Sequence, residues 1–178
     1  MVPSHRLGLV THCLRNQRKA KERIWSSQTS TKQRKRGRRL SESRINIASG
    51  GHWETIVGYS RAVRIGNIIV IAGTTATDSE GKVIGVGDAY TQTKVIFEKI
   101  GRALNEAGAS FKDVIRTRIY TTDISKWNEI GKAHGETFSH IKPAATMVEV
   151  RKLIVDEAIV EIEAEAVMNP SPAAGKVV

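Results

Sequence analysis

The chain contains little cysteine, few aromatic residues and no long apolar run. Its single cysteine, Cys13, lies near the N-terminus, which excludes an intrachain disulfide and, in the core, a cysteine nucleophile or a cysteine metal site. No apolar run approaches the roughly 20 residues needed to cross a bilayer, and residues 7–10 are too few for the apolar part of a secretory signal. We therefore expect an intracellular protein, located in the cytoplasm.

Acidic residues are almost missing from residues 1–44. This segment holds 13 of the 28 Lys and Arg residues but only two acids, Glu22 and Glu42, so its net charge is +11, whereas the rest of the chain sums to −1. We predict a disordered basic leader. It could bind nucleic acid or an anionic surface, serve as an organellar transit segment, or have no function ahead of the real start. The last reading is favoured, because the core opens cleanly at about Arg44 and the leader shows no aromatic pattern suited to base stacking.

The remaining residues predict one α+β domain, residues 45–170, followed by a flexible tail, 171–178. Alternating and continuous apolar runs predict strands, and apolar residues at steps of three and four predict two amphipathic helices. Asp88 and Ser125 are the expected N-caps of the helices, and Gly108 ends the first. The predicted order is ββαβαββ, with strands at 59–65, 68–72, 114–121, 143–150 and 159–167.

Two helices can cover only one face of such a sheet. The last strand alternates Val160, Ile162 and Ala164 with Glu161, Glu163 and Glu165, and residues 68–72 are apolar on both faces. The second face must therefore be solvated or buried against another copy, and we expect an oligomer.

Several motifs, in this order and spacing, resemble the Rid family (YjgF-like, reactive intermediate deaminases, also labelled endoribonuclease L-PSP). The resemblance covers about residues 50–168. It implies a chorismate-mutase-like fold, with both helices packed on one face, in a homotrimer whose strands form a central barrel with three intersubunit clefts. The motifs are Gly58-Tyr59-Ser60-Arg61-Ala62-Val63, Ile71-Ala72-Gly73, Asp113-Val114-Ile115-Arg116-Thr117, Arg118-Ile119-Tyr120-Thr121-Thr122-Asp123, Pro143-Ala144-Ala145-Thr146 and Val160-Glu161-Ile162-Glu163-Ala164.

The resemblance also implies a chemistry. Family members with deaminase activity hydrolyse imines such as 2-aminoacrylate to keto acids and ammonia without a cofactor, and an Arg in a Pro-Ala-Arg-Ser motif grips the substrate carboxylate. Here Ala145 stands at that position, so the two-pronged guanidinium contact is missing and the chain is placed in a subgroup lacking the signature Arg.

The remaining site residues are carried over from the resemblance. Glu161 and Tyr59 are the candidate catalytic residues, with Glu161 positioning the attacking water. Each has a structural alternative: Glu161 could join Glu163 and Glu165 in a ladder of ion pairs with Arg116 and Arg118, which we favour for the latter two glutamates, and Tyr59 could fill a subunit seam. The candidate ligand-binding residues are Gly73, Thr74, Ala145, Thr146 and His134, although a histidine on an apolar helix stripe is more often a packed core residue.

We expect a small-molecule ligand, no metal, no cofactor, no membrane contact, and nucleic-acid binding only non-specifically through the leader. His52, His134 and His140 lack metal-ligand spacing. The main hypothesis is an imine or enamine hydrolase with a non-standard substrate. The alternatives are a non-catalytic ligand-binding or regulatory trimer, an ordinary deaminase in which Arg61, Arg118 or Lys142 restores carboxylate binding, and, least favoured, an endoribonuclease acting as a translation inhibitor.

Overall fold

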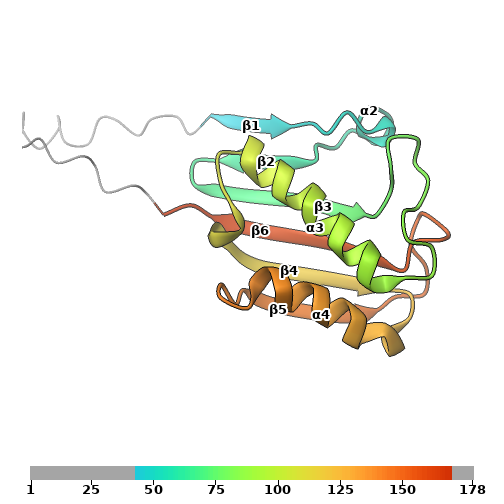
Figure 1. Cartoon of the computed structure of the whole chain (residues 1–178). Coiled ribbons are helices and arrows are strands. Elements are labelled where there is room, and N and C mark those ends of the chain that lie inside the picture. Colours follow the sequence, from blue (N-terminus) through green and yellow to red (C-terminus); the bar gives the residue numbers. More distant parts are fainter. Residues whose placement is uncertain (1–42, 170–178) are drawn as a thin grey trace, which may run out of the picture. The chain divides into compact units, whose positions relative to one another are not determined.

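The computed structural model describes residues 43–169, which form one six-stranded sheet with helices on one face (Figure 1). The expected tail, Cys13 and nearly all of the expected leader lie outside the described residues. The sheet order is β1-β2-β3-β6-β4-β5; β4 and β5 run parallel, and every other neighbouring pair is antiparallel. The strands are β1 (Arg44–Ile47), β2 (Ala62–Ile65), β3 (Ile68–Thr75), β4 (Val114–Thr121), β5 (Ala144–Glu149) and β6 (Val160–Val167).

The α-helices of the described part are α2 (His52–Val57), α3 (Ala89–Glu106) and α4 (Trp127–Phe138), and short 3-10 turns η1 (Phe111–Asp113) and η2 (Ile124–Lys126) precede β4 and α4. Asp88 caps α3 as predicted, since its side chain accepts a hydrogen bond from the Thr91 amide. Ser125 is not the N-cap of α4. Instead Asp123 caps η2 by accepting from the Ser125 amide, and α4 continues from that turn.

The predicted α+β class is confirmed, but the start of the domain differs from the prediction. The sequence analysis missed β1 and α2, because β1 buries only Ile47 and α2 is six residues long, so neither shows a clear apolar period. The strand predicted from Tyr59 begins only at Ala62. Gly58 ends α2 in the left-handed conformation (φ 78°), and this turn places Tyr59 outside the sheet.

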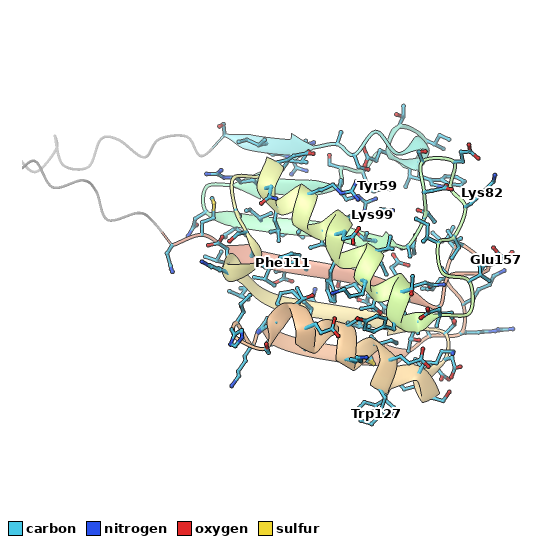
Figure 2. The ribbon with its side chains drawn as sticks, in the orientation of Figure 1. Tyr59, Lys82, Lys99, Phe111, Trp127 and Glu157 are labelled. Carbon is cyan, nitrogen blue, oxygen red and sulfur yellow. The ribbon has the colours of Figure 1, made fainter. Side chains whose placement is uncertain are left out.

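The hydrophobic core lies between the sheet and the two long helices. α3 and α4 cross the same face of the sheet (Figure 1) and bury the inward side chains of β3, β4 and β6. Phe97 and Phe111 each meet Phe138 edge to face, with ring centroids 5.2 and 5.5 Å away, so aromatic contacts join α3, α4 and η1. Trp127, the first residue of α4, points away from the sheet and is 56% exposed (Figure 2).

The opposite face of the sheet carries charged and apolar side chains side by side; we call it the open face. Arg118 forms ion pairs of 2.9 Å with both Glu163 and Glu165, which confirms its part of the ladder favoured for these two glutamates, whereas Arg116 forms no ion pair with them. Ile68 and Val70 lie on the same face and are about half exposed. Two helices therefore leave one face of the sheet uncovered, as the sequence led us to expect.

Candidate functional site

A register shift in β3 brings a glycine against a glutamate. The pairing of β3 with β6 is irregular between Ile71 and Thr74, and Gly73 lies within that irregularity. A Cβ atom built on Gly73 would overlap Oε1 of Glu161, so the carboxylate rests directly on the glycine backbone. Glycine leaves this space, because any other residue would place its Cβ atom where the carboxylate lies.

Glu161 has the electrostatic character of a proton acceptor. Its side chain is half-buried, and burial raises the pKa of its carboxyl group above the ordinary value; Arg61 opposes this rise and Glu163 adds to it. A carboxylate with a raised pKa is a stronger base towards water than an exposed glutamate.

Arg61 binds the end of β3 where β2 no longer pairs with it. The ladder between the two strands ends at Ala62 and Ile71, followed by one hydrogen bond from the Ala72 amide to the Arg61 carbonyl. Beyond that point Nη1 of Arg61 donates to the Gly73 carbonyl and to Oγ1 of Thr74, both at 2.9 Å. Thr74 itself is buried, and its hydroxyl donates to the Ala72 carbonyl, so it holds Arg61 in place from inside the chain.

Lys99, a residue of α3, binds the backbone at the same end of β3 (Figure 2). Its Nζ donates to the carbonyls of Thr75 and Thr77 at 2.9 and 3.0 Å. Burial, together with repulsion from Arg61 and Arg102, lowers the pKa of this amine. The sequence analysis did not identify Lys99, because a lysine on a helix carries no signal of the carbonyl groups it reaches.

Tyr59 completes this first group of residues. Its hydroxyl accepts a hydrogen bond from Nη2 of Arg61 at 3.3 Å, and the guanidinium carbon lies 5.7 Å from the ring centroid. Contacts of Arg61 and Gly73 thus connect residues from the turn after α2 to the start of β6. This group consists of Tyr59, Arg61, Gly73, Thr74 and Glu161.

Ala145 belongs to a second, separate group. It pairs with Thr117 on the helix-covered side of the sheet, and Oγ1 of Thr117 lies 3.1 Å from Nε2 of His134. His134 packs against Phe97 and Phe138, and burial lowers the pKa of its imidazole, which favours the neutral ring. These contacts fit the packed histidine considered in the sequence analysis.

Thr146 is on the opposite side of β5 from Ala145. It is exposed and pairs with Arg118 on the open face. Because β4 lies between β5 and β6, one chain does not bring Ala145, Thr146 and His134 together with Glu161. Within residues 43–169, no group of three or more His, Cys, Asp or Glu side chains is arranged to hold a metal ion, and no helix there is long and apolar enough to cross a membrane.

Comparison with known proteins gives this geometry its context. The family model described as Endoribonuclease L-PSP matches residues 51–168, which include every candidate residue named above. This chain belongs to that family, the Rid or YjgF family indicated by its motifs. Among its Rid relatives, an uncharacterised protein of Streptomyces coelicolor is 36% identical over 126 residues, covering 71% of this chain and 93% of the relative.

Two further Rid proteins extend the comparison. A protein of Acinetobacter baylyi named 3-aminoacrylate deaminase RutC is 33% identical over 108 residues, covering 61% of this chain and 85% of that protein. A crystal structure from Mycobacterium tuberculosis, described as a member of the highly conserved YjgF/YER057c/UK114 family, is 47% identical with a TM-score of 0.65, and the match covers 71% of this chain and all of that one.

Proposed function

We propose that this chain is a cofactor-free hydrolase of small imines or enamines that acts in the cytoplasm as a homotrimer, with its reaction taking place between copies. The observation that carries the proposal is the Glu161 carboxylate, half-buried against Gly73 with a raised pKa. A general base needs this combination of access and basicity near working pH. The Rid relative from Acinetobacter baylyi is named for the deamination of an enamine, which supports the same substrate class.

The proposed reaction uses water as its only co-reactant. Glu161 accepts a proton from water while the water oxygen bonds to the imine carbon, and the proton then moves to the nitrogen. The hydroxyl group of this addition product gives its remaining proton to the nitrogen as the carbon–nitrogen bond breaks, so ammonia leaves and a carbonyl compound remains. Tyr59 is proposed to donate a hydrogen bond to the reacting group, while its hydroxyl oxygen accepts one from Arg61.

The absence of a guanidinium at position 145 directs this proposal towards a non-standard substrate. Ala145 offers only a methyl group beside Thr117, so a carboxylate at that point of the cleft would find no charged partner. An Ala145→Arg variant would place a cation beside Thr117 and His134.

The hydrolase proposal is tested by generating 2-aminoacrylate in situ with a serine dehydratase and following keto-acid release. We expect the native chain to accelerate release from this carboxylate-bearing imine less than it accelerates hydrolysis of a neutral imine, and the Ala145→Arg variant to lower KM for 2-aminoacrylate by about 10-fold, as one added charge-assisted hydrogen bond would. A native chain that accelerates neither this imine nor a neutral one would reject the hydrolase in favour of a non-catalytic ligand-binding trimer.

The trimer is proposed from the open face and from the separation of the two groups of candidate residues. Exposed Ile68 and Val70 on one face of a sheet are suited to burial against another copy. We expect native mass spectrometry to give three chains, and Val70→Glu, which adds a charge beside Glu165, to shift the mass towards monomer. A stable native monomer with full imine hydrolysis would contradict this part of the proposal.

A further inference from the structure

We propose that Gln92 of α3 is a positioning residue for the proposed base, because its side-chain amide holds the start of β6 and thereby keeps Glu161 against Gly73. This inference rests on the proposed function and adds a residue that acts through Glu161. Gln92 is fully buried. A buried amide is costly unless its donors and its acceptor are used, so the partners of Gln92 show which segments it holds.

The amide of Gln92 binds two segments that are far apart in sequence. Its Oε1 accepts a hydrogen bond from the Ile159 amide at 2.8 Å, and its Nε2 donates to the Glu157 carbonyl at 3.2 Å. Nε2 also donates, at 3.1 Å, to the carbonyl of Gly85 in the loop before α3. One side chain thus joins α3 to the loop that enters it and to the residues that lead into β6, at the right-hand end of Figure 1.

These hydrogen bonds replace a strand neighbour that is missing ahead of β6. The pairing of β3 with β6 ends at Glu161, so residues 157–159 have no paired strand on that side in the described part of the chain. A residue of a parallel strand donates to one carbonyl of its neighbour and accepts from the amide two residues further on. Gln92 makes the same two bonds, to Glu157 and Ile159, and so extends the hydrogen-bond ladder beyond the end of β3.

The carboxylate of Glu161 depends on its own backbone for its position. Within residues 43–169 it forms no hydrogen bond and no ion pair that could hold it in place. It rests on the Gly73 backbone, where even a Cβ atom would overlap its Oε1. Because Glu161 follows Ile159 by two residues, a shift of the chain at Ile159 would move the carboxylate off the glycine.

Such a shift would also change the basicity of Glu161. Burial is the main cause of its raised pKa, and the two charges that also act on it, Arg61 and Glu163, form no hydrogen bond with Gln92. A carboxylate that leaves its buried position would return towards the ordinary pKa of glutamate. A substitution that only lowers the stability of the fold would leave the pKa of the folded protein unchanged.

The test compares Gln92→Leu with Thr93→Val in the full chain. Leucine is close to glutamine in size but makes none of its hydrogen bonds. Thr93 is the matched control, because it is the next residue of α3 and is equally buried, yet its hydroxyl donates only to the Ala89 carbonyl of the same helix. Both variants should unfold at a lower temperature than the native chain, since each loses buried hydrogen bonds.

For Gln92→Leu we expect kcat of imine hydrolysis to fall by about 10- to 100-fold while KM changes by less than about 2-fold, because the base is displaced and substrate binding is not. The pKa of the Glu161 carboxyl group, measured by carbon NMR titration with Glu161→Gln to identify its signal, should move down towards 4.5. Thr93→Val should change neither kcat nor this pKa. Hydrogen exchange at the Ile159 amide should become faster in Gln92→Leu alone.

An unchanged kcat and Glu161 pKa in Gln92→Leu, despite fast exchange at Ile159, would overturn the inference, and so would an equal fall of kcat in Thr93→Val. If Gln92→Leu fails to fold, Gln92→Asn, whose amide is one methylene group shorter, decides by the same two values. The expected fall of the Glu161 pKa in a chain that hydrolyses no imine would reject only the proposed function. Imine hydrolysis with an unchanged kcat and pKa in Gln92→Leu would reject only the role of Gln92.

Discussion

Replacing Glu161 with Gln is expected to lower the rate of imine hydrolysis by about 10²- to 10⁴-fold, the usual contribution of a general base. Gln keeps the size of the side chain and its place against Gly73 but cannot accept the proton of the attacking water. The measurement is kcat for keto-acid release under single-substrate conditions, with Glu163→Gln as the control, because Glu163 is bound to Arg118 and Tyr120 on the open face. Equal kcat values for Glu161→Gln and the native chain would show that another group activates the water.

The pH dependence of the same reaction follows from the raised pKa of Glu161. Because the base must be ionised, kcat should rise with pH through a midpoint above the ordinary glutamate value of 4.5. The pKa of Glu161 is higher in the folded state than in the unfolded state, so the ionised side chain destabilises the fold at neutral pH. This destabilisation disappears at lower pH, where the side chain is protonated. Glu161→Gln should therefore unfold at a higher temperature than the native chain at pH 7, by a difference that shrinks towards pH 4.

Replacing Gly73 with Ala is expected to lower kcat by about 100-fold, because the new methyl group would occupy the position of Oε1 of Glu161 and displace the carboxylate. The displaced side chain would also lose part of its burial, so the midpoint of the pH–rate profile should move down towards the ordinary value. Kinetics over the acid pH range measure both effects in one experiment.

The control for Gly73→Ala is Gly131→Ala in α4, where an added Cβ meets nothing within 4 Å. Alanine in a helix interior should stabilise the chain by about 1 kcal/mol relative to glycine and leave kcat unchanged. If Gly73→Ala behaves like Gly131→Ala in kinetics, the close approach of Glu161 to the glycine backbone has no catalytic role.

The longer strands and the two long helices could be predicted from the sequence, whereas the short β1 and α2 and the arrangement around Arg61 could not. The alternation of residues 160–167 and the Asp88 cap depend on residues close together in sequence, so both can be predicted from the sequence alone. Arg61 was recognised only as one of three cations that could reach a carboxylate. The position of Glu54 near its buried Nε depends on the hydrogen bond that Glu54 accepts from the Ser49 amide, five residues away, and Glu54 lies in an element too short to show a period.

The position of Glu161 was indicated by its motif, but its raised pKa results from its burial, which occurs beside the register shift in β3. That shift places Gly73 opposite the carboxylate, and no local residue preference specifies it. The separation of Ala145 and Glu161 has a similar origin: both belong to neighbouring motifs in the sequence, yet strand order inserts β4 between them. Sheet order is set by the whole domain and is therefore not visible in the motifs.

The two cations at the end of β3, Arg61 and Lys99, also oppose aggregation by backbone pairing between strands of different molecules. Carbonyl groups that extend past a neighbouring strand invite backbone pairing with a strand from another molecule. Arg61 and Lys99 fill those acceptors at Gly73, Thr75 and Thr77 with charged donors, which a foreign strand could not displace without burying both charges. Resistance to fibre formation would then depend in part on Arg61, so loss of Arg61 should be tolerated less well in a crowded cell than its effect on turnover alone would suggest.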